Sequence, residues 1–170
     1  KSLHGRDLGR PMAEQINTNS YKANLEIFSE TLQRLAVDDR NIVAVTSDSR
    51  GSGKLVPFGQ KFPDQMVEVG IAEQNLVGVA AGLASCGKKV FAVSPACFLT
   101  ARALEQIKND VAYSDNPVNV IGISAGVSYG ALGSTHHSLH DYAALRAINN
   151  ITIVAPADNF ETAQAIELAA

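Results

Sequence analysis

The carboxylate of Glu73 is the best indication of function in this sequence of 170 residues. It lies in the run Gly70-Ile71-Ala72-Glu73-Gln74-Asn75, between a short apolar segment and a stretch rich in alanine and glycine that is typical of a helix. An acidic residue in the first turn of a helix stabilises the positive end of the helix dipole by about 0.3–1 kcal/mol. This local role explains Glu73 by itself, so a chemical role needs support from other parts of the chain.

Other reactive or binding side chains follow later apolar segments. Phe98 and Arg102 lie in a segment with helical spacing, where a core aromatic ring and a solvated cation are the ordinary interpretations. Asp48 lies in Thr46-Ser47-Asp48-Ser49, a context that equally suits an Asx-turn. Histidine side chains change charge near neutral pH, and His136 is therefore a candidate for proton transfer.

The sequence predicts no metal site. Three histidines fall at positions 136, 137 and 140, but Asp141 is the only acidic residue close to them and no cysteine is near. The spacing of Cys86 and Cys97 fits neither a zinc site nor a disulfide scaffold. We therefore expect both cysteines to be free, buried thiols in a reducing compartment.

Composition limits the class of protein. A hydrophobic content of 46% and a net charge of -3 are typical of one domain with a buried core. The pI is about 5.8 and no basic run is interleaved with aromatic residues, which argues against a nucleic-acid surface. No apolar run reaches the length of about 18 residues that suggests a membrane span, and the start of the chain does not resemble a signal peptide. We therefore expect a cytoplasmic protein that binds neither nucleic acid nor membrane.

The two ends of the chain are treated separately from its middle. Residues 1–11 lack apolar periodicity and precede Met12, which suggests a remnant of expression or a disordered leader. We expect residues 12–170 to form one domain. The helix predicted to begin after Asp158 stops at Ala170, so the chain looks truncated before any C-terminal domain.

Apolar patterns in the chain alternate between helical and strand-like. They predict helices over residues 22–37, 71–85, 98–113 and 139–148 and after residue 158, and strands over residues 41–46, 66–69, 89–93, 118–123 and 151–154. This alternation predicts an α/β fold with a mainly parallel sheet sandwiched between helices. Ligands of such sheets bind beyond the carboxyl ends of the strands, where Glu73 and the loops 47–53 and 124–135 are expected.

Glycines Gly78 and Gly82 lie inside the predicted helix 71–85, and each costs about 1 kcal/mol relative to alanine. Close approach of another helix would offset this cost. That helix could belong to the same domain or to another subunit.

The motifs Val69-Gly70-Ile71-Ala72-Glu73-Gln74-Asn75, Phe98-Leu99-Thr100-Ala101-Arg102-Ala103-Leu104-Glu105-Gln106 and Gly133-Ser134-Thr135-His136-His137 occur in one order with suitable intervals. Together with Val154-Ala155-Pro156-Ala157-Asp158, they resemble the pyrimidine-binding domain of the transketolase family, from about residue 19 to residue 170. The resemblance implies the fold that binds thiamine diphosphate. It also implies a C-terminal section or subunit of a split transketolase, which transfers a two-carbon ketol unit between sugars or sugar phosphates.

The resemblance also implies roles for individual residues. Glu73 would be catalytic and would hydrogen-bond N1′ of the aminopyrimidine ring of thiamine diphosphate. Phe98 would stack on that ring, and Arg102 and Asp48 would also contribute to cofactor binding. His136 would be the second catalytic residue and would contact the substrate at the mouth of the site.

The family's diphosphate-binding domain, which holds Mg²⁺ and the pyrophosphate, does not occur in this sequence. The resemblance therefore implies a diphosphate-binding partner subunit that supplies the Mg²⁺ ligands, and a homo-oligomer formed through the pyrimidine domain. Three alternatives stay open: a 1-deoxyxylulose-5-phosphate synthase activity, an activity like that of 2-oxo-acid dehydrogenase beta subunits, and a non-catalytic module that only binds partners.

The chain departs from transketolases at positions that concern the substrate. Tyr21 stands where transketolases carry an arginine for the acceptor phosphate, and Ser124 stands in place of a histidine. The acidic pair in the following loop is replaced by Ala131-Leu132. The resemblance therefore carries cofactor activation over to this chain, but not the recognition of ordinary sugar phosphates.

Overall fold

A four-stranded, entirely parallel sheet organises residues 21–170, which are the residues that the computed structural model describes. The strands lie in the order β2-β1-β3-β4, and their bounds are β1 (Ile42–Thr46), β2 (Met66–Glu68), β3 (Lys89–Pro95) and β4 (Val118–Ile123). This confirms the predicted α/β class with a parallel sheet. The leader predicted at residues 1–11 lies outside the described residues.

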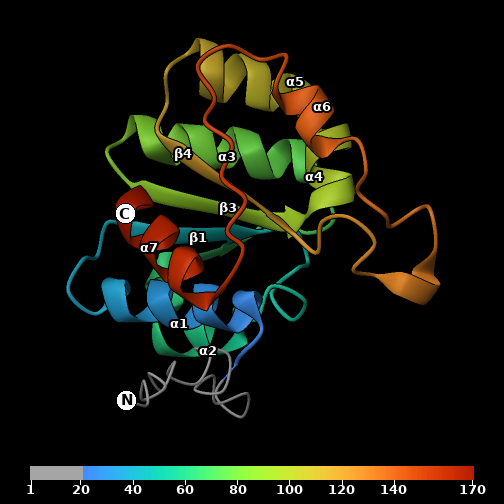
Figure 1. Cartoon of the computed structure of the whole chain (residues 1–170). Helices are drawn as coiled ribbons and strands as arrows, with labels where there is room; N and C mark the ends of the chain where they lie inside the picture. The colour runs from blue at the N-terminus through green and yellow to red at the C-terminus, as the bar shows by residue number, and fades with distance from the viewer. Residues whose placement is uncertain (1–20) are drawn as a thin grey trace, which may run out of the picture.

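Helices cover both faces of the sheet (Figure 1). One face carries α3 (Glu73–Ser85), α4 (Ala96–Arg102), α5 (Leu104–Gln106), the π-helix η4 (Ile107–Tyr113) and, beside them, α6 (Asp141–Leu145). The other face carries α1 (Asn24–Ala36), α2 (Val56–Lys61) and α7 (Asn159–Ala169). Short 3₁₀ turns are η3 (Pro63–Gln65) and η5 (Gly130–Leu132).

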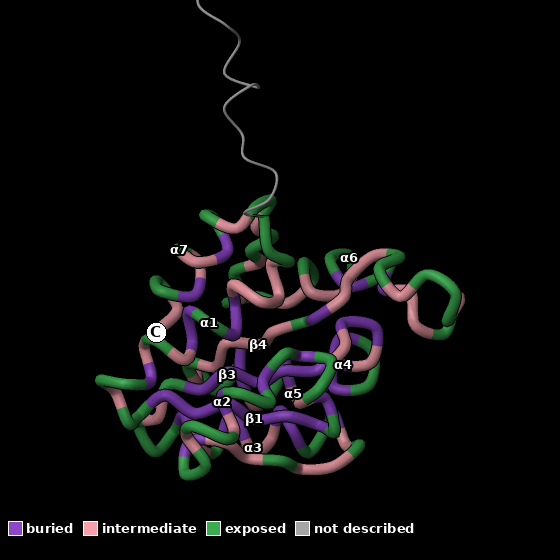
Figure 2. Tube along the Cα trace, turned by 90° about the horizontal axis from the view of Figure 1, so that it is seen from below, coloured by how far each residue is buried: buried purple, intermediate pink, exposed green. Residues whose placement is uncertain are grey.

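Alternating side chains of the central strands build two cores. Val43 and Val45 of β1 pack with α3, whereas Ile42 and Ala44 pack with α1, and β3 repeats this alternation. Every residue of β1 is buried, as expected for a strand covered on both faces. Figure 2 shows that β1 and β3 consist mainly of buried residues. The loops and helices that follow these two strands therefore start from the core of the domain.

One predicted helix is broken in the structure. The expected continuous helix over residues 98–113 begins earlier, at Ala96, and is interrupted at Ala103 before α5 and the π-helix η4. Apolar periodicity does not detect such a break, because the buried side chains keep an approximately helical spacing across it. Wide π turns of this kind are frequent near functional sites.

The strand predicted over residues 151–154 is wrong. Residues 151–157 form neither helix nor strand, and this segment runs across the sheet between α6 and α7 (Figure 1). Ile151 packs against the core beside α3, whereas Val154 is 62% exposed. The apolar run 151–154 is consistent with the burial of Ile151, but no neighbouring strand among the described residues forms backbone hydrogen bonds with it.

Two other expectations need correction. Helix α2 was not predicted, because Pro57 and Gly59 hide its pattern, although proline is well tolerated in a first helical turn. Cys86 is exposed and only Cys97 is buried, so the prediction of two buried thiols is wrong for Cys86. Both cysteines are free, as predicted.

The glycines of α3 do not lie against another helix within the described residues. A Cβ atom added at Gly78 or Gly82 would meet no heavy atom within 4 Å. Helix packing within residues 21–170 therefore does not explain these glycines, and among these residues the face of α3 that carries them is open.

The packing of α3 on the sheet can be tested at Leu76, whose side chain is completely buried. Leu76→Ala should lower the free energy of unfolding by about 2–5 kcal/mol, because it removes a core side chain and leaves a cavity. The control is Leu168→Ala at a helical position that is 89% exposed, with an expected change within about 0.5 kcal/mol. Urea denaturation measures both, and equal losses would contradict this description of the core.

Candidate functional site

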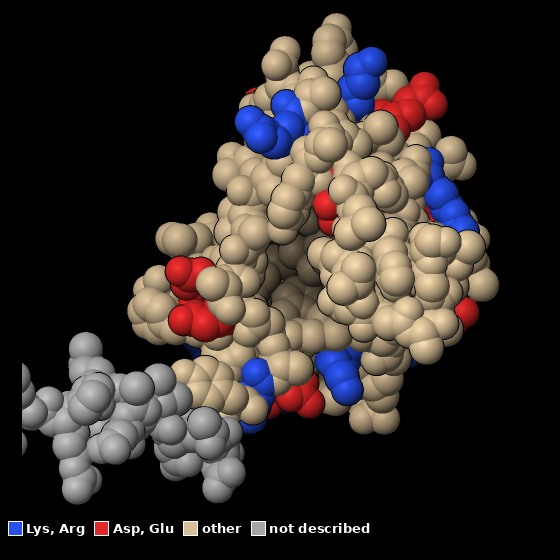
Figure 3. Space-filling view, turned by 45° about the vertical axis from the view of Figure 1, so that its right-hand side comes forward, with Lys and Arg blue, Asp and Glu red and all other residues tan. Residues whose placement is uncertain are grey.

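The predicted functional residues lie where the parallel strands end. β1 leads into the loop with Asp48, β2 into the turn before α3, β3 into α4, and β4 into the loop that carries His136. The carboxyl ends of parallel strands share one edge of a sheet, so segments far apart in sequence meet there. This side turns forward in Figure 3, where the surface is hollowed and the atoms around the hollow are mainly uncharged.

Glu73 is the first residue of α3 and follows the extended N-cap residue Ala72. Its side chain is only 6% exposed, and its Oε1 accepts a hydrogen bond of 2.8 Å from Nη1 of Arg102. Among the hydrogen bonds of residues 21–170, Oε2 of Glu73 has no partner. The sequence prediction that places this carboxylate at the helix start is confirmed.

Arg102 connects Glu73 to Phe98. It is the last residue of α4, and its guanidinium carbon lies 4.1 Å from the centroid of the Phe98 ring. A carboxylate that is removed from water needs a charged or hydrogen-bonding partner, and a guanidinium also stacks favourably on an aromatic face. One side chain therefore holds the acid and covers one face of the ring.

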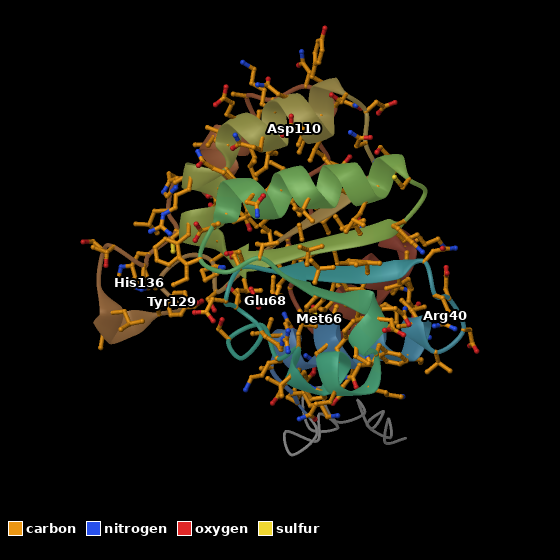
Figure 4. The ribbon with its side chains drawn as sticks, turned by 180° about the vertical axis from the view of Figure 1, so that it is seen from behind. Arg40, Met66, Glu68, Asp110, Tyr129 and His136 are labelled. Carbon is orange, nitrogen blue, oxygen red and sulfur yellow. The ribbon has the colours of Figure 1, made fainter. Side chains whose placement is uncertain are left out.

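His136 approaches the same ring from the loop after β4. Its imidazole centroid lies 5.1 Å from that of Phe98 and 5.5 Å from that of Tyr129, both in edge-on geometry. Its Nδ1 is 3.0 Å from Oγ1 of Thr135. Figure 4 shows Tyr129 and His136 next to each other on this loop. The structure thus brings Glu73, Arg102, Phe98 and His136 into one chain of contacts.

The loop that carries His136 is closed at its base. Gly126 and Ser138 exchange backbone hydrogen bonds of 3.0 and 2.8 Å in an isolated antiparallel bridge. The hydroxyl of Ser138 donates to Oδ2 of the buried Asp141 over 2.9 Å, which anchors the bridge to α6. These contacts limit where the histidine can move.

Asp48 lies at the same edge, but within residues 21–170 no hydrogen bond or ion pair joins its side chain to Glu73. Its backbone is left-handed, with φ of 55°, and its N–H donates to Oε1 of Glu68 over 2.6 Å. The connection to the site therefore runs through Glu68, and a role of the Asp48 carboxylate in cofactor binding stays a prediction.

Two residues of the site were missed by the sequence analysis. Glu68 is an acidic residue at the end of β2, and nothing in a strand pattern distinguishes it from an ordinary solvated one. Tyr129 lies in a loop rich in glycine and serine, where only its aromatic character could have drawn attention. Partial burial by itself raises the pKa of the Glu68 carboxyl. The opposing effects are larger together, so this pKa lies below its ordinary value. They are hydrogen bonds from Asp48, Thr46 and Gly70 and the positive charge of Arg50.

Cys97 precedes Phe98 but does not look like a nucleophile. Burial raises the pKa of its thiol, and the opposing hydrogen bonds and the charge of Arg102 do not compensate. In residues 21–170, no three His, Cys, Asp or Glu side chains are grouped so that they could hold a metal ion. Within the same residues, no helix combines the length and apolar character needed to cross a membrane.

Two open pockets among the described residues lie away from this site. Each has a volume of about 280 Å³ and borders α1, one beside α2 and η3 and the other beside α7, and none of the predicted site residues lines them. Glu73, by contrast, is buried at the carboxyl ends of the strands, beside the half-exposed Arg102.

Comparison with known proteins agrees with this geometry. The family model described as "Transketolase, pyrimidine binding domain" matches residues 21–170. The chain is 53% identical over 150 residues to a subunit of apulose-4-phosphate transketolase from Phocaeicola vulgatus, covering 88% of this chain and 48% of the relative. It is 39% identical over 163 residues to 1-deoxy-D-xylulose-5-phosphate synthase of Methylacidiphilum infernorum, covering 96% of this chain and 26% of the relative.

A solved structure described as "Split gene transketolase, inactive beta4 tetramer" superimposes with a TM-score of 0.77 at 34% identity, covering 88% of this chain and 48% of that chain. This chain therefore spans about half the length of these transketolase relatives. The matched region includes all the residues of the candidate site. The chain belongs to the transketolase family and forms its pyrimidine-binding domain.

Proposed function

We propose that this chain supplies the aminopyrimidine half of a thiamine diphosphate site, in an enzyme that transfers a two-carbon ketol unit between sugars or sugar phosphates. The observation that carries the proposal is the buried carboxylate of Glu73, which Arg102 connects to the ring of Phe98. The relatives of the chain include a transketolase subunit and a 1-deoxy-D-xylulose-5-phosphate synthase, which supports this function.

The residues present fit an aminopyrimidine ring. Such a ring has flat faces and a ring nitrogen, N1′, that needs a carboxyl partner. Glu73 offers Oε2, because Arg102 occupies Oε1. Because Arg102 lies over one face of the Phe98 ring, we expect the opposite face to stack on the aminopyrimidine.

Each residue then has a distinct task. When bound, thiamine diphosphate supplies the carbanion chemistry that transfers the ketol unit. Glu73 holds a proton between its Oε2 and N1′ in a site shielded from water. Arg102 keeps the carboxylate in place, Phe98 stacks, and His136 contacts the substrate and moves protons there. Asp48 adds a polar contact to the cofactor at the end of β1.

The other half of the site belongs to a diphosphate-binding partner. We expect this partner to hold Mg²⁺ and the pyrophosphate, as the family resemblance implies. The relative with 53% identity is named as one subunit of its transketolase, which supports a second kind of subunit. The cytoplasmic location predicted from the sequence stays a prediction.

A second copy of this chain covers the open face of α3. Gly78 and Gly82 leave this face without side-chain bulk, and another helix can therefore approach its backbone closely. The related split transketolase is described as a tetramer of its beta chain, which supports contact between like subunits.

The first substrate to test is apulose 4-phosphate, because the relative with 53% identity is named for it. Tyr21, Ser124 and Leu132 replace transketolase residues for sugar phosphates, so a different sugar phosphate is consistent with the sequence. Deoxyxylulose-phosphate synthesis is the second candidate, favoured by the 39% identity to that synthase. Product analysis with the chain and its partner subunit separates the two.

Glu73→Gln should reduce turnover at least about 100-fold when the chain is combined with its diphosphate-binding subunit, because an amide cannot exchange the proton with N1′. The matched control is Glu105→Gln at an exposed position on α5, which should leave turnover within about twofold. Steady-state kinetics measures both. Full turnover of Glu73→Gln would reject the catalytic role, and with it the proposed use of the cofactor.

Phe98→Ala should weaken binding of thiamine diphosphate by about tenfold, since stacking and the associated apolar contact contribute about 1.4 kcal/mol. The control is Phe160→Ala, at a ring that is 68% exposed on α7. Calorimetric titration of the complex with thiamine diphosphate and Mg²⁺ gives both affinities. An unchanged affinity in Phe98→Ala would show that the ring is only part of the core.

Gly82→Leu should dissociate the assembly formed by this chain without lowering the stability of the isolated chain, because the added side chain points into open space on α3 and replaces a glycine that is unfavourable inside a helix. Gln164→Leu places the same side chain at an exposed position of α7 and should leave the assembly intact. Sedimentation equilibrium measures the masses. The same mass for parent and Gly82→Leu would place the subunit contact elsewhere.

A further inference from the structure

The carboxylate of Glu68 joins three parts of the sheet edge. Its Oε2 accepts a hydrogen bond of 2.7 Å from the hydroxyl of Thr46, the last residue of β1. Its Oε1 accepts the backbone N–H of Asp48 over 2.6 Å and the backbone N–H of Gly70 over 3.1 Å. Asp48 belongs to the loop after β1 and Gly70 to the turn before α3, so one side chain connects both.

These bonds begin where the backbone ladder ends. The last ladder-like contact between the two segments is the bond of 3.0 Å from the N–H of Val69 to the carbonyl of Thr46. Beyond this bond, each of the two segments has a residue in the left-handed backbone conformation, with φ of 55° at Asp48 and 75° at Gly70. A residue other than glycine in this conformation costs free energy, which the surrounding contacts must offset.

Both connected segments lead to residues of the proposed site. The loop after β1 carries Asp48 itself. The turn at Gly70 continues through a backbone bond of 2.7 Å from Ala72 N–H to the Gly70 carbonyl, and Glu73 follows immediately. Figure 4 shows Glu68 at this end of the sheet, on the same side as Tyr129 and His136. A shift of the Gly70 turn would therefore move the carboxylate of Glu73.

We propose that Glu68 is a positioning residue that fixes the loop after β1 against the turn before α3, and thereby sets where Asp48 and Glu73 meet the cofactor. Its effect on cofactor binding rests on the proposed function. Its effect on the two segments is independent of the proposed function, because the hydrogen bonds form within this chain and need neither cofactor nor partner.

Three variants separate this role from general stabilisation. Glu68→Ala removes all acceptors. Glu68→Gln keeps an oxygen for the N–H groups of Asp48 and Gly70. Asp39→Ala is the matched control, because Asp39 accepts the Asn41 N–H over 2.8 Å and pairs with Lys89 over 3.0 Å.

Asp39 lies just before the start of β1, at the end of the sheet opposite to Glu68. Its hydrogen bond from Asn41, with its pairing to Lys89, lowers the pKa of the Asp39 carboxyl despite the opposing effect of burial. It therefore resembles Glu68 as a carboxylate that is hydrogen-bonded to backbone, but the length of β1 separates it from the proposed site.

Amide hydrogen exchange of the chain, followed by NMR, tests the fixing of the two segments directly. The amides of Asp48 and Gly70 should exchange at least about tenfold faster in Glu68→Ala, less than about threefold faster in Glu68→Gln, and unchanged in Asp39→Ala. Exchange at the parent rate in Glu68→Ala, or equal acceleration in Asp39→Ala, would overturn the proposal.

Calorimetric titration with thiamine diphosphate and Mg²⁺, on the chain combined with its diphosphate-binding subunit, tests the consequence. The affinity should fall at least about tenfold in Glu68→Ala and stay within about threefold of the parent in Glu68→Gln and Asp39→Ala. An unchanged affinity in Glu68→Ala, while Glu73→Gln abolishes turnover, would overturn the positioning role and leave the proposed function intact. If the parent complex binds no cofactor, the proposed function fails together with this role, and the exchange rates still report whether Glu68 fixes the segments.

Discussion

The ion pair between Glu73 and Arg102 is the interaction on which the candidate site depends. The fold removes the carboxylate of Glu73 from water, and a carboxylate in that position is stable only when a partner compensates the lost hydration. Arg102 does so from a different helix while stacking on Phe98. Within residues 21–170, the same contact leaves one carboxylate oxygen without a hydrogen-bond partner and covers one face of the ring.

The parallel sheet makes this arrangement possible. Its four strands end at one edge, and the central strands are buried on both faces, so the loops and helix starts that follow them have a rigid support. Beyond that support, side-chain hydrogen bonds position the chain: Glu68 holds two segments together, and Asp141 anchors the base of the histidine loop. Rigid elements with hydrogen-bonded supporting residues are the usual basis of a precise site.

Local patterns were sufficient to predict the parallel sheet and the place of Glu73 at a helix start, because burial and helix ends leave a periodic record in the sequence. The pairing of Glu73 with Arg102 joins residues 29 positions apart and leaves no such record. A local pattern also does not show which distant segments lie next to a residue. For this reason it wrongly predicted a strand at residues 151–154, which have no neighbouring strand among the described residues, and a buried thiol at Cys86. Glu68 was overlooked because its role depends on the two segments that meet beside it.

The most direct test of the central claim is a crystal structure of this chain with its diphosphate-binding subunit and thiamine diphosphate. The account predicts that Oε2 of Glu73 lies within about 3.2 Å of N1′, with the aminopyrimidine ring against the face of Phe98 opposite Arg102 and Arg102 still on Oε1. A structure in which another group contacts N1′, or in which Glu73 faces solvent while the cofactor is bound, would contradict it.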